Sequence, residues 1–164
     1  MPITFTKVKL PNGWLGNMSG HAVEYNGKTW RTAEALFQAL RFDSDEVREA
    51  IRAQHSPMGA KLIAKRHADK MTVVPMSTQD LANMELVLRL KLDQHPDLKD
   101  ALLATGQETI IEDITNRPAG GRHAFWGMAL VDGIWRGENT LGKLWMKLRE
   151  ELRNERQQPP ASNP

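Results

Sequence analysis

The sequence contains no cysteine, and this absence excludes disulfides, thiolate metal sites and a cysteine nucleophile. It also lacks the basic and apolar regions of a signal peptide, because the chain opens with Met1-Pro2-Ile3-Thr4-Phe5. No apolar run approaches the roughly 20 residues that a membrane span needs. We therefore expect a protein of a reducing compartment, the cytoplasm, with no membrane partner.

Several nucleotide and metal motifs are also missing. Neither GxxxxGK[ST] nor GxGxxG occurs, which argues against a P-loop NTPase and a dinucleotide-binding fold. The five histidines show no HExxH or other metal-ligand spacing. We therefore predict neither a metal nor a cofactor.

What the chain does contain is enough for one globular domain. It has 164 residues, 40% of them hydrophobic, with 22 basic and 20 acidic side chains. The two signs of charge are interleaved, so the small net charge of +2 is weak evidence for a polyanionic partner. We predict a single domain over residues 1–156 and a disordered polar tail over 157–164, which is rich in Gln and Pro.

The local patterns predict a mainly helical α+β fold with a few short strands. An extended segment is expected over 1–10, a strand over 109–114, and a hairpin over 21–30, where Asn26-Gly27 suits a type I′ turn. Helices are expected from Thr32, over 44–54, from Ser56-Pro57, from Ser77 to His95, over 97–104, and from Asn139 or Thr140 onward. Ser77 with Asp80 resembles a capping box, and residues 116–123 read as a loop.

Polar and aromatic residues gather at the predicted helix starts and in Gly-rich loops. The first group is residues 14–18, the second runs from Gly27 through Glu34 to Gln38, and the third comprises Trp126-Gly127 and residues 137–144. Glu34 and Gln38 of the second group have helical spacing with Arg41, which follows the group, and all three lie off the apolar stripe, so their side chains should be neighbours.

These segments resemble the NADAR, or YbiA-like, family. The order of the family's motifs is preserved from about residue 14 to 152: Asn17-Met18, Gly27-Lys28-Thr29-Trp30, Glu34, Phe37-Gln38-Ala39, Ser56-Pro57-Met58, Thr105-Gly106, Glu112, Trp126-Gly127, and Asn139-Thr140-Leu141-Gly142-Lys143-Leu144 with the helix that follows. One such motif would mean little, but their shared order indicates the fold of that family.

The resemblance implies cleavage of an N-glycosidic bond between a ribosyl carbon and a nitrogen. The implied substrates are a ribosylated small molecule of the riboflavin pathway or an ADP-ribosylated nucleic acid. An oxocarbenium-like transition state needs a nearby carboxylate, and the family's carboxylate position is Glu34. The implied site residues are Glu34 and His123 for catalysis, with Asn17, Trp30, Arg31, Gln38, Trp126, Gly127 and Asn139 for substrate binding.

Some positions depart from the family pattern. His123 stands where the family often has an acid three residues before Trp-Gly, and it could serve as an acid, a base or a phosphate ligand. Asp113 or Asp132 could replace the missing carboxylate. These changes leave a second hypothesis open, in which the domain has lost catalysis and binds a nucleotide, a nucleic acid or a protein.

Each candidate also has a structural interpretation. Glu34 in a first helical turn stabilises the helix dipole, Trp30 and Trp126 suit a core, and Asn139 suits a helix cap. A nucleic-acid binder would present a positive rim including Arg31, Arg122 and Arg136. A protein-binding factor would instead expose an apolar patch, for which Trp135 is a candidate anchor.

Overall fold

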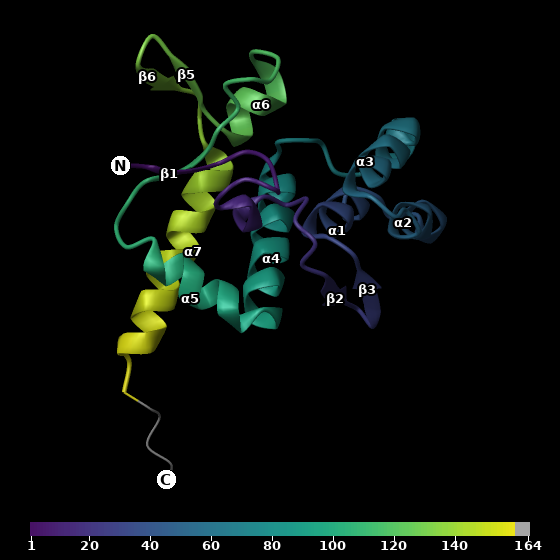
Figure 1. The fold of residues 1–164 in the computed structure, drawn as a ribbon. Helices are drawn as coiled ribbons and strands as arrows, with labels where there is room; N and C mark the ends of the chain where they lie inside the picture. Colours follow the sequence, from purple (N-terminus) through teal and green to yellow (C-terminus); the bar gives the residue numbers. More distant parts are fainter. Residues whose placement is uncertain (160–164) are drawn as a thin grey trace. The chain divides into compact units, whose positions relative to one another are not determined.

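The computed structural model describes residues 1–159, and these form two compact units (Figure 1). The N-terminal unit is Phe5–His95. The C-terminal unit comprises Met1–Thr4 and the chain from Pro96 onward. Each unit has its own packed elements and is described by itself.

The N-terminal unit begins with the short 3-10 helix η1 (Gly13–Leu15) and an antiparallel hairpin, β2 (Val23–Tyr25) and β3 (Lys28–Trp30). Asn26 and Gly27 connect the two strands with φ of 50° and 76°. Both turn residues therefore have the positive φ that a type I′ turn requires. The predicted hairpin is confirmed.

Four α-helices follow in this unit, with a 3-10 turn, η2 (Ala68–Lys70), between the third and the fourth. They are α1 (Ala33–Ala39), α2 (Asp45–Arg52), α3 (Pro57–Arg66) and α4 (Thr78–Gln94). Each begins after a Ser or Thr whose hydroxyl accepts a backbone N–H of the first turn: Thr32, Ser44, Ser56 and Ser77. These hydroxyls satisfy N–H groups that the helix leaves without partners, which is why the helices start there.

Helix α1 lies at the centre of the N-terminal unit. It packs against α2, α3 and α4, and every one of its seven residues is buried (Figure 1). Because neighbours cover all of its faces, its polar residues Glu34 and Gln38 are buried together with Leu36 and Phe37. This burial is what makes the polar face of α1 unusual.

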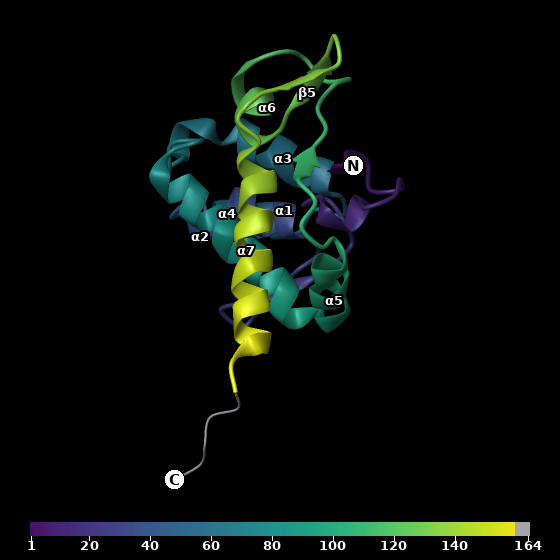
Figure 2. The same ribbon diagram turned by 90° about the vertical axis from the view of Figure 1, so that its left-hand side faces the viewer.

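The C-terminal unit is built around the long helix α7 (Thr140–Gln157). Helix α5 (Pro96–Ala104) and strand β4 (Ile110–Glu112) pack against it, as does α6 (Gly121–Trp126) (Figure 2). Strand β1 (Ile3–Phe5) pairs with β4, and the Ile3 amide donates to the Thr109 carbonyl at 2.8 Å. The predicted apolar face of α7 is confirmed as buried: Leu141, Leu144, Trp145, Leu148 and Leu152.

The structure corrects one local prediction in this unit and adds a hairpin that was not predicted. Residues 121–123 are not loop, because Gly120 and Gly121 adopt positive φ and turn the chain into α6. A hairpin of β5 (Ala129–Val131) and β6 (Ile134–Arg136) was not predicted, although Asp132-Gly133 forms its turn with φ of 50° and 76°. Gln157, the first residue of the predicted tail, ends α7, and residues 160–164 of that tail lie outside the described part.

The strands pair only two by two, in the sheets β1-β4, β2-β3 and β5-β6 of the described chain. Helices supply most of the secondary structure. The mainly helical α+β class is therefore confirmed. Over residues 1–159, no helix combines the length and apolar character needed to cross a membrane.

Candidate functional site

Glu34 is the second residue of α1, and its carboxylate is held on one side. Its side chain is buried, with 8% of the residue exposed. Oε1 accepts a hydrogen bond from Gln38 Nε2 at 2.9 Å, and the Glu34 amide donates to the Asn17 carbonyl at 3.0 Å. Within residues 1–159, Oε2 receives no hydrogen bond. One carboxylate oxygen is thus fixed and the other remains available.

Gln38 is linked in turn to a buried ion pair. Its Oε1 accepts from Arg41 Nη1 at 3.4 Å. Arg41 also makes a two-pronged contact with Asp80 of α4: Nε to Oδ1 and Nη2 to Oδ2 are both 2.8 Å. Asp80 is fully buried and accepts the Met76 amide at 2.8 Å as well. We call the four side chains Glu34, Gln38, Arg41 and Asp80 the α1 relay.

Asn17 lies in the loop after η1, beside the start of α1. It is 7% exposed, and its Nδ2 donates to the Met84 sulfur at 2.9 Å. Its Oδ1 is buried and has no hydrogen-bond partner in the described chain. A buried acceptor without a donor is costly, so this oxygen is suited to receive a hydrogen bond from a ligand.

Lys91 of α4 holds the same loop. Its fully buried ammonium donates to three acceptors of the loop: Trp14 O at 2.5 Å, Gly16 O at 3.0 Å and Ser19 Oγ at 2.7 Å. Burial lowers the pKa of Lys91 to about 7. The lysine fixes residues on both sides of Asn17 and thereby its position.

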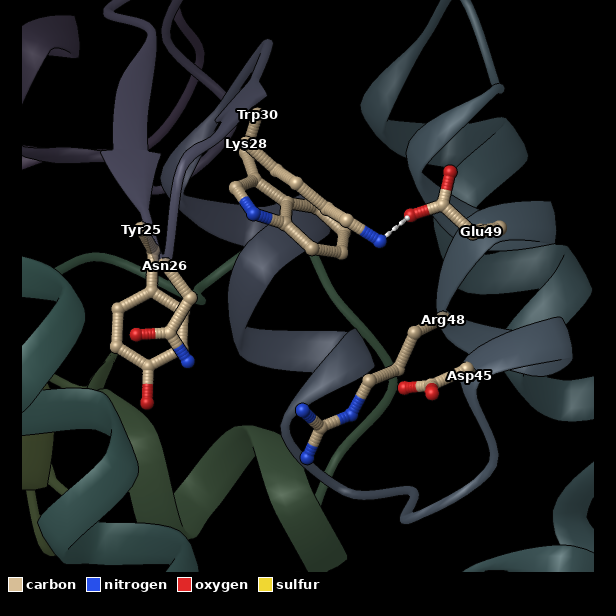
Figure 3. Close-up of a pocket in the computed structure, with 7 residues that line it drawn as sticks. All are labelled: Tyr25, Asn26, Lys28, Trp30, Asp45, Arg48 and Glu49. Carbon is tan, nitrogen blue, oxygen red and sulfur yellow. Dashed lines mark hydrogen bonds and ion pairs between the residues drawn. The ribbon is translucent and has the colours of Figure 1, made fainter.

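Trp30 and Arg31 lie at the junction between β3 and α1. The buried Trp30 ring lines a pocket between the β2–β3 hairpin and α2, whose other walls are Tyr25, Asn26, Lys28, Asp45, Arg48 and Glu49 (Figure 3). The Trp30 Nε1 is buried without a hydrogen-bond partner in the part of the chain that the structure describes. Arg31 is exposed, and its Nη1 contacts Gln54 O and His55 Nδ1.

The wall that α2 contributes to this pocket is an ion-pair network. Glu49 accepts from Arg52 Nη2 at 2.8 Å and from Lys28 Nζ at 2.6 Å. The hydrogen bonds from Arg52 and then Lys28 lower the pKa of Glu49 to about 2. None of the residues lining the pocket belongs to the α1 relay, so the two features are separate.

In the C-terminal unit, the side chain of Asn139 bridges α7 to β4. Its Nδ2 donates to Ile110 O at 2.8 Å, and its Oδ1 accepts the Glu112 amide at 3.2 Å. The structure corrects the predicted cap: Asn139 precedes α7 with φ of 53°, but its side chain makes no capping hydrogen bond. The bonds to β4 take both polar ends of the amide instead.

The other candidates of this unit lie around β4 and α6. Gly127 is buried, and a Cβ there would come within 2.5 Å of the Glu112 carbonyl oxygen, so only glycine fits. Trp126 is partly exposed and stacks edge-to-face on Phe125, with ring centroids 4.8 Å apart. His123 is half-buried in α6, and its carbonyl accepts the Gly127 amide at 2.8 Å.

The remaining charged candidates have local roles or lie at the surface. Glu112 pairs with Arg117 at 3.0 Å. The Asp113 carboxylate accepts the Thr115 amide and hydroxyl, and Asp132 is exposed in the β5–β6 turn. Arg122 and Arg136 are exposed, and Trp135 is half-buried in β6. Over residues 1–159, no three His, Cys, Asp or Glu side chains lie close enough together to hold a metal ion.

The structure thus brings Asn17, Glu34 and Gln38 together around the start of α1. It places Gly127 and Asn139 together at β4. Sequence reasoning missed two residues that hold the candidates around α1 in place: Asp80, which binds Arg41, and Lys91, which holds the loop of Asn17. Asp80 was read only as a capping residue, and Lys91 carried no signal beyond being a lysine within an apolar helix pattern.

Comparison with known proteins identifies the family. The NADAR domain model matches residues 4–153. N-glycosidase YbiA of Escherichia coli is 33% identical over 150 residues, which cover 92% of this chain and 88% of YbiA. N-glycosidase Npun_R5314 of Nostoc punctiforme is 31% identical, with 94% of each chain covered.

A solved structure agrees with these sequence matches. The NMR structure of E. coli YbiA matches with a TM-score of 0.77 at 30% identity, covering 99% of this chain and 94% of that one. The predicted resemblance is confirmed over nearly the whole chain, which is similar to proteins named as N-glycosidases, and the protein belongs to the NADAR domain family.

Proposed function

We propose that this N-glycosidase hydrolyses the bond between a ribosyl carbon and a base or amine nitrogen, with Glu34 as its catalytic carboxylate. The hydrolase class follows from the family. The observation that supports Glu34 is its geometry: Oε1 is held by Gln38 while Oε2 receives no hydrogen bond within the described residues. The expected substrates carry a ribosyl phosphate or an ADP-ribosyl group.

The chemistry needs a negative charge beside the ribosyl carbon. When the C–N bond breaks, its electron pair leaves with the nitrogen, which takes up a proton, and the sugar carbon becomes positive. The Glu34 carboxylate stabilises that charge, and water then adds to the carbon and gives up a proton. Asp80 is unsuited to this role, because Arg41 and the Met76 amide engage both of its oxygens.

Two neighbours of Glu34 suit substrate binding. Asn17 presents a buried Oδ1 that lacks a partner in the described chain, and a sugar hydroxyl or an amino group of the substrate would supply the missing donor. Arg31 is exposed one residue before the Thr32 cap of α1, where a phosphate would meet both a guanidinium and a helix start.

The other assignments come from the family resemblance and stay predictions. They are His123 as an acid, a base or a phosphate ligand, and Trp30, Trp126, Gly127 and Asn139 as substrate contacts. One domain over 1–156, a cytoplasmic location and the choice between a small ribosylated molecule and an ADP-ribosylated nucleic acid are predictions of the same kind.

The test compares two glutamates at the same helix position. Glu34 in α1 and Glu46 in α2 each stand two residues after the capping residue, but Glu46 is exposed. Purified wild type, Glu34→Gln and Glu46→Gln are incubated with a ribosylaminopyrimidine phosphate and with DNA carrying ADP-ribosylated guanine. Mass spectrometry follows the released base and sugar.

Wild type and Glu46→Gln should release product from one substrate class, and Glu34→Gln should lose at least about 100-fold in rate. A role limited to the helix dipole would make the two variants alike. Binding without release by folded wild-type protein would instead favour a domain that binds its ligand and has lost catalysis.

A further inference from the structure

The α1 relay contains an arginine that makes no hydrogen bond to Glu34 and reaches it only through Gln38. We propose that Arg41 is a positioning residue for the catalytic carboxylate, acting on Glu34 through Gln38 and anchored by Asp80. The inference rests on the proposed role of Glu34 and extends it to Arg41 and Asp80.

The orientation of the Gln38 side-chain amide is determined by its two partners, Glu34 and Arg41. An amide oxygen and nitrogen look alike in shape, so a glutamine can lie either way round, and its partners decide which way is stable. Arg41 has only donors, and the ionised Glu34 has only acceptors. Gln38 Oε1 must therefore face Arg41 at 3.4 Å, and Nε2 must face Glu34 at 2.9 Å. The reversed amide would set donor against donor and acceptor against acceptor.

Arg41 can impose this direction because it is itself fixed. Asp80 holds Nε and Nη2 at 2.8 Å each, and the guanidinium carbon lies 4.6 Å from the centre of the Phe37 ring. These contacts leave Nη1 aimed at Gln38. A lysine in this position carries its three donors on a flexible stem with no planar fork, so it would fix the direction of the donor toward Gln38 less firmly than the arginine does.

The consequence for Glu34 is a single side-chain orientation. The Gln38 donor holds Oε1, and the covalent geometry of the carboxylate then sets the direction of Oε2. A catalytic group displaced by about 1 Å can lose about 100-fold in rate, so this hold matters for turnover. Arg41, two residues beyond α1, and Asp80 also tie this segment to α4, and the test must separate that stabilising role from positioning.

A double-mutant cycle distinguishes the positioning of Glu34 from a general stabilisation of the fold. The variants are Gln38→Met, Arg41→Lys and the two combined, because removing the arginine charge altogether would leave Asp80 buried without its cation. Arg52→Lys is the control, since Arg52 makes a similar fork to Glu49 in the exposed network of α2. Turnover and KM are measured on the substrate that the wild type cleaves.

We expect Gln38→Met to lower kcat about 100-fold and Arg41→Lys about 10-fold, with KM changed by less than about 3-fold. The combined variant should be no slower than Gln38→Met alone, because the arginine acts only through the amide. Arg52→Lys should match the wild type. Losses that multiply to about 1,000-fold in the combined variant would show that Arg41 acts independently of Gln38 and would overturn the proposal.

A second readout needs no activity. The side-chain NH₂ group of Gln38 gives its own pair of signals in a ¹H–¹⁵N spectrum, and Arg41→Lys should move or broaden them while Arg52→Lys leaves them in place. Unmoved signals would refute the relay. If Glu34→Gln retained full turnover, the role of Glu34 would be wrong, and the Gln38 signals would still decide whether Arg41 orients the amide.

Discussion

The glycine at position 142 tests the packing of α7 on β4. Gly142 is the third residue of α7, and glycine there is expected to cost about 1 kcal/mol relative to alanine in helix propensity. Sequence reasoning alone would thus predict that Gly142→Ala stabilises the protein. The structure predicts the opposite, because a Cβ at 142 would stand 2.2 Å from the Ile110 carbonyl oxygen and 2.5 Å from both polar atoms of Asn139.

The expected loss of stability in Gly142→Ala can be worked out from the displacement that the added Cβ forces between α7 and β4. Heavy atoms at 2.2 Å must separate by about 1 Å, and overpacking of this kind costs about 1–3 kcal/mol. The shift also disturbs the two Asn139 hydrogen bonds to β4, at about 0.5–1.5 kcal/mol each. After the helix-propensity gain of about 1 kcal/mol is subtracted, we expect a net loss of about 1–5 kcal/mol in the free energy of unfolding.

Thermal unfolding followed by circular dichroism measures this loss. For a chain of this size, about 2–4 °C of Tm is lost per kcal/mol, so Gly142→Ala should melt about 2–20 °C below the wild type, with the middle of that range at about 9 °C. Gly59→Ala is the matched control: Gly59 is the third residue of α3, and a Cβ there meets only the side chains of Gln54 and Ser56, at 3.1 Å or more. That variant should melt within a few degrees of the wild type. If Gly142→Ala melted as high as the control, the close approach of α7 to β4 would be wrong.

Two further predictions concern Asn139 and Glu49. Asn139→Ala should lower the free energy of unfolding by about 2–4 kcal/mol in urea titrations, because it removes the donor to Ile110 O and the acceptor of the Glu112 amide; an unchanged midpoint would contradict the bridge. Glu49 has a pKa lowered to about 2, so the stability it contributes is present above about pH 4.5 and is lost as the pH falls toward 2. Glu49→Gln should therefore be slightly less stable than the wild type at pH 7, and the difference should vanish near pH 2; a constant difference between pH 7 and 2 would exclude the ion pair.

Local chemistry in the sequence was enough to predict much of the fold. The Asn26-Gly27 turn and the hydroxyl caps of three helices, Thr32, Ser56 and Ser77, need only residues within a few positions of one another, and the structure confirms them. The Asp132-Gly133 turn carried the same kind of signal and was overlooked. The missed start of α6 depends on Gly120 and Gly121, whose backbone freedom permits several conformations.

Part of the candidate site could also be predicted locally. Glu34, Gln38 and Arg41 are spaced as neighbours on one helix, and the structure places their side chains in contact. Asn139 stands at the capping position of α7, as predicted, but its side-chain amide does not cap the helix. It forms hydrogen bonds to β4 instead, about 28 residues earlier in the chain. A capping residue and a bridge to a strand look the same in sequence, since both call for a short polar side chain.

The sequence by itself determined most of the helix starts, the first hairpin and the family, because these follow from neighbouring residues and from motif order, and the same motif order made Glu34 the candidate carboxylate. Only the tertiary structure decided that Glu34 is buried, that Asp80 anchors Arg41 from 39 residues away, and that Lys91 holds the loop carrying Asn17. The physical reason is that burial and long-range hydrogen bonds depend on which helices pack together. A helical pattern shows which side chains share a face, and packing decides what that face meets.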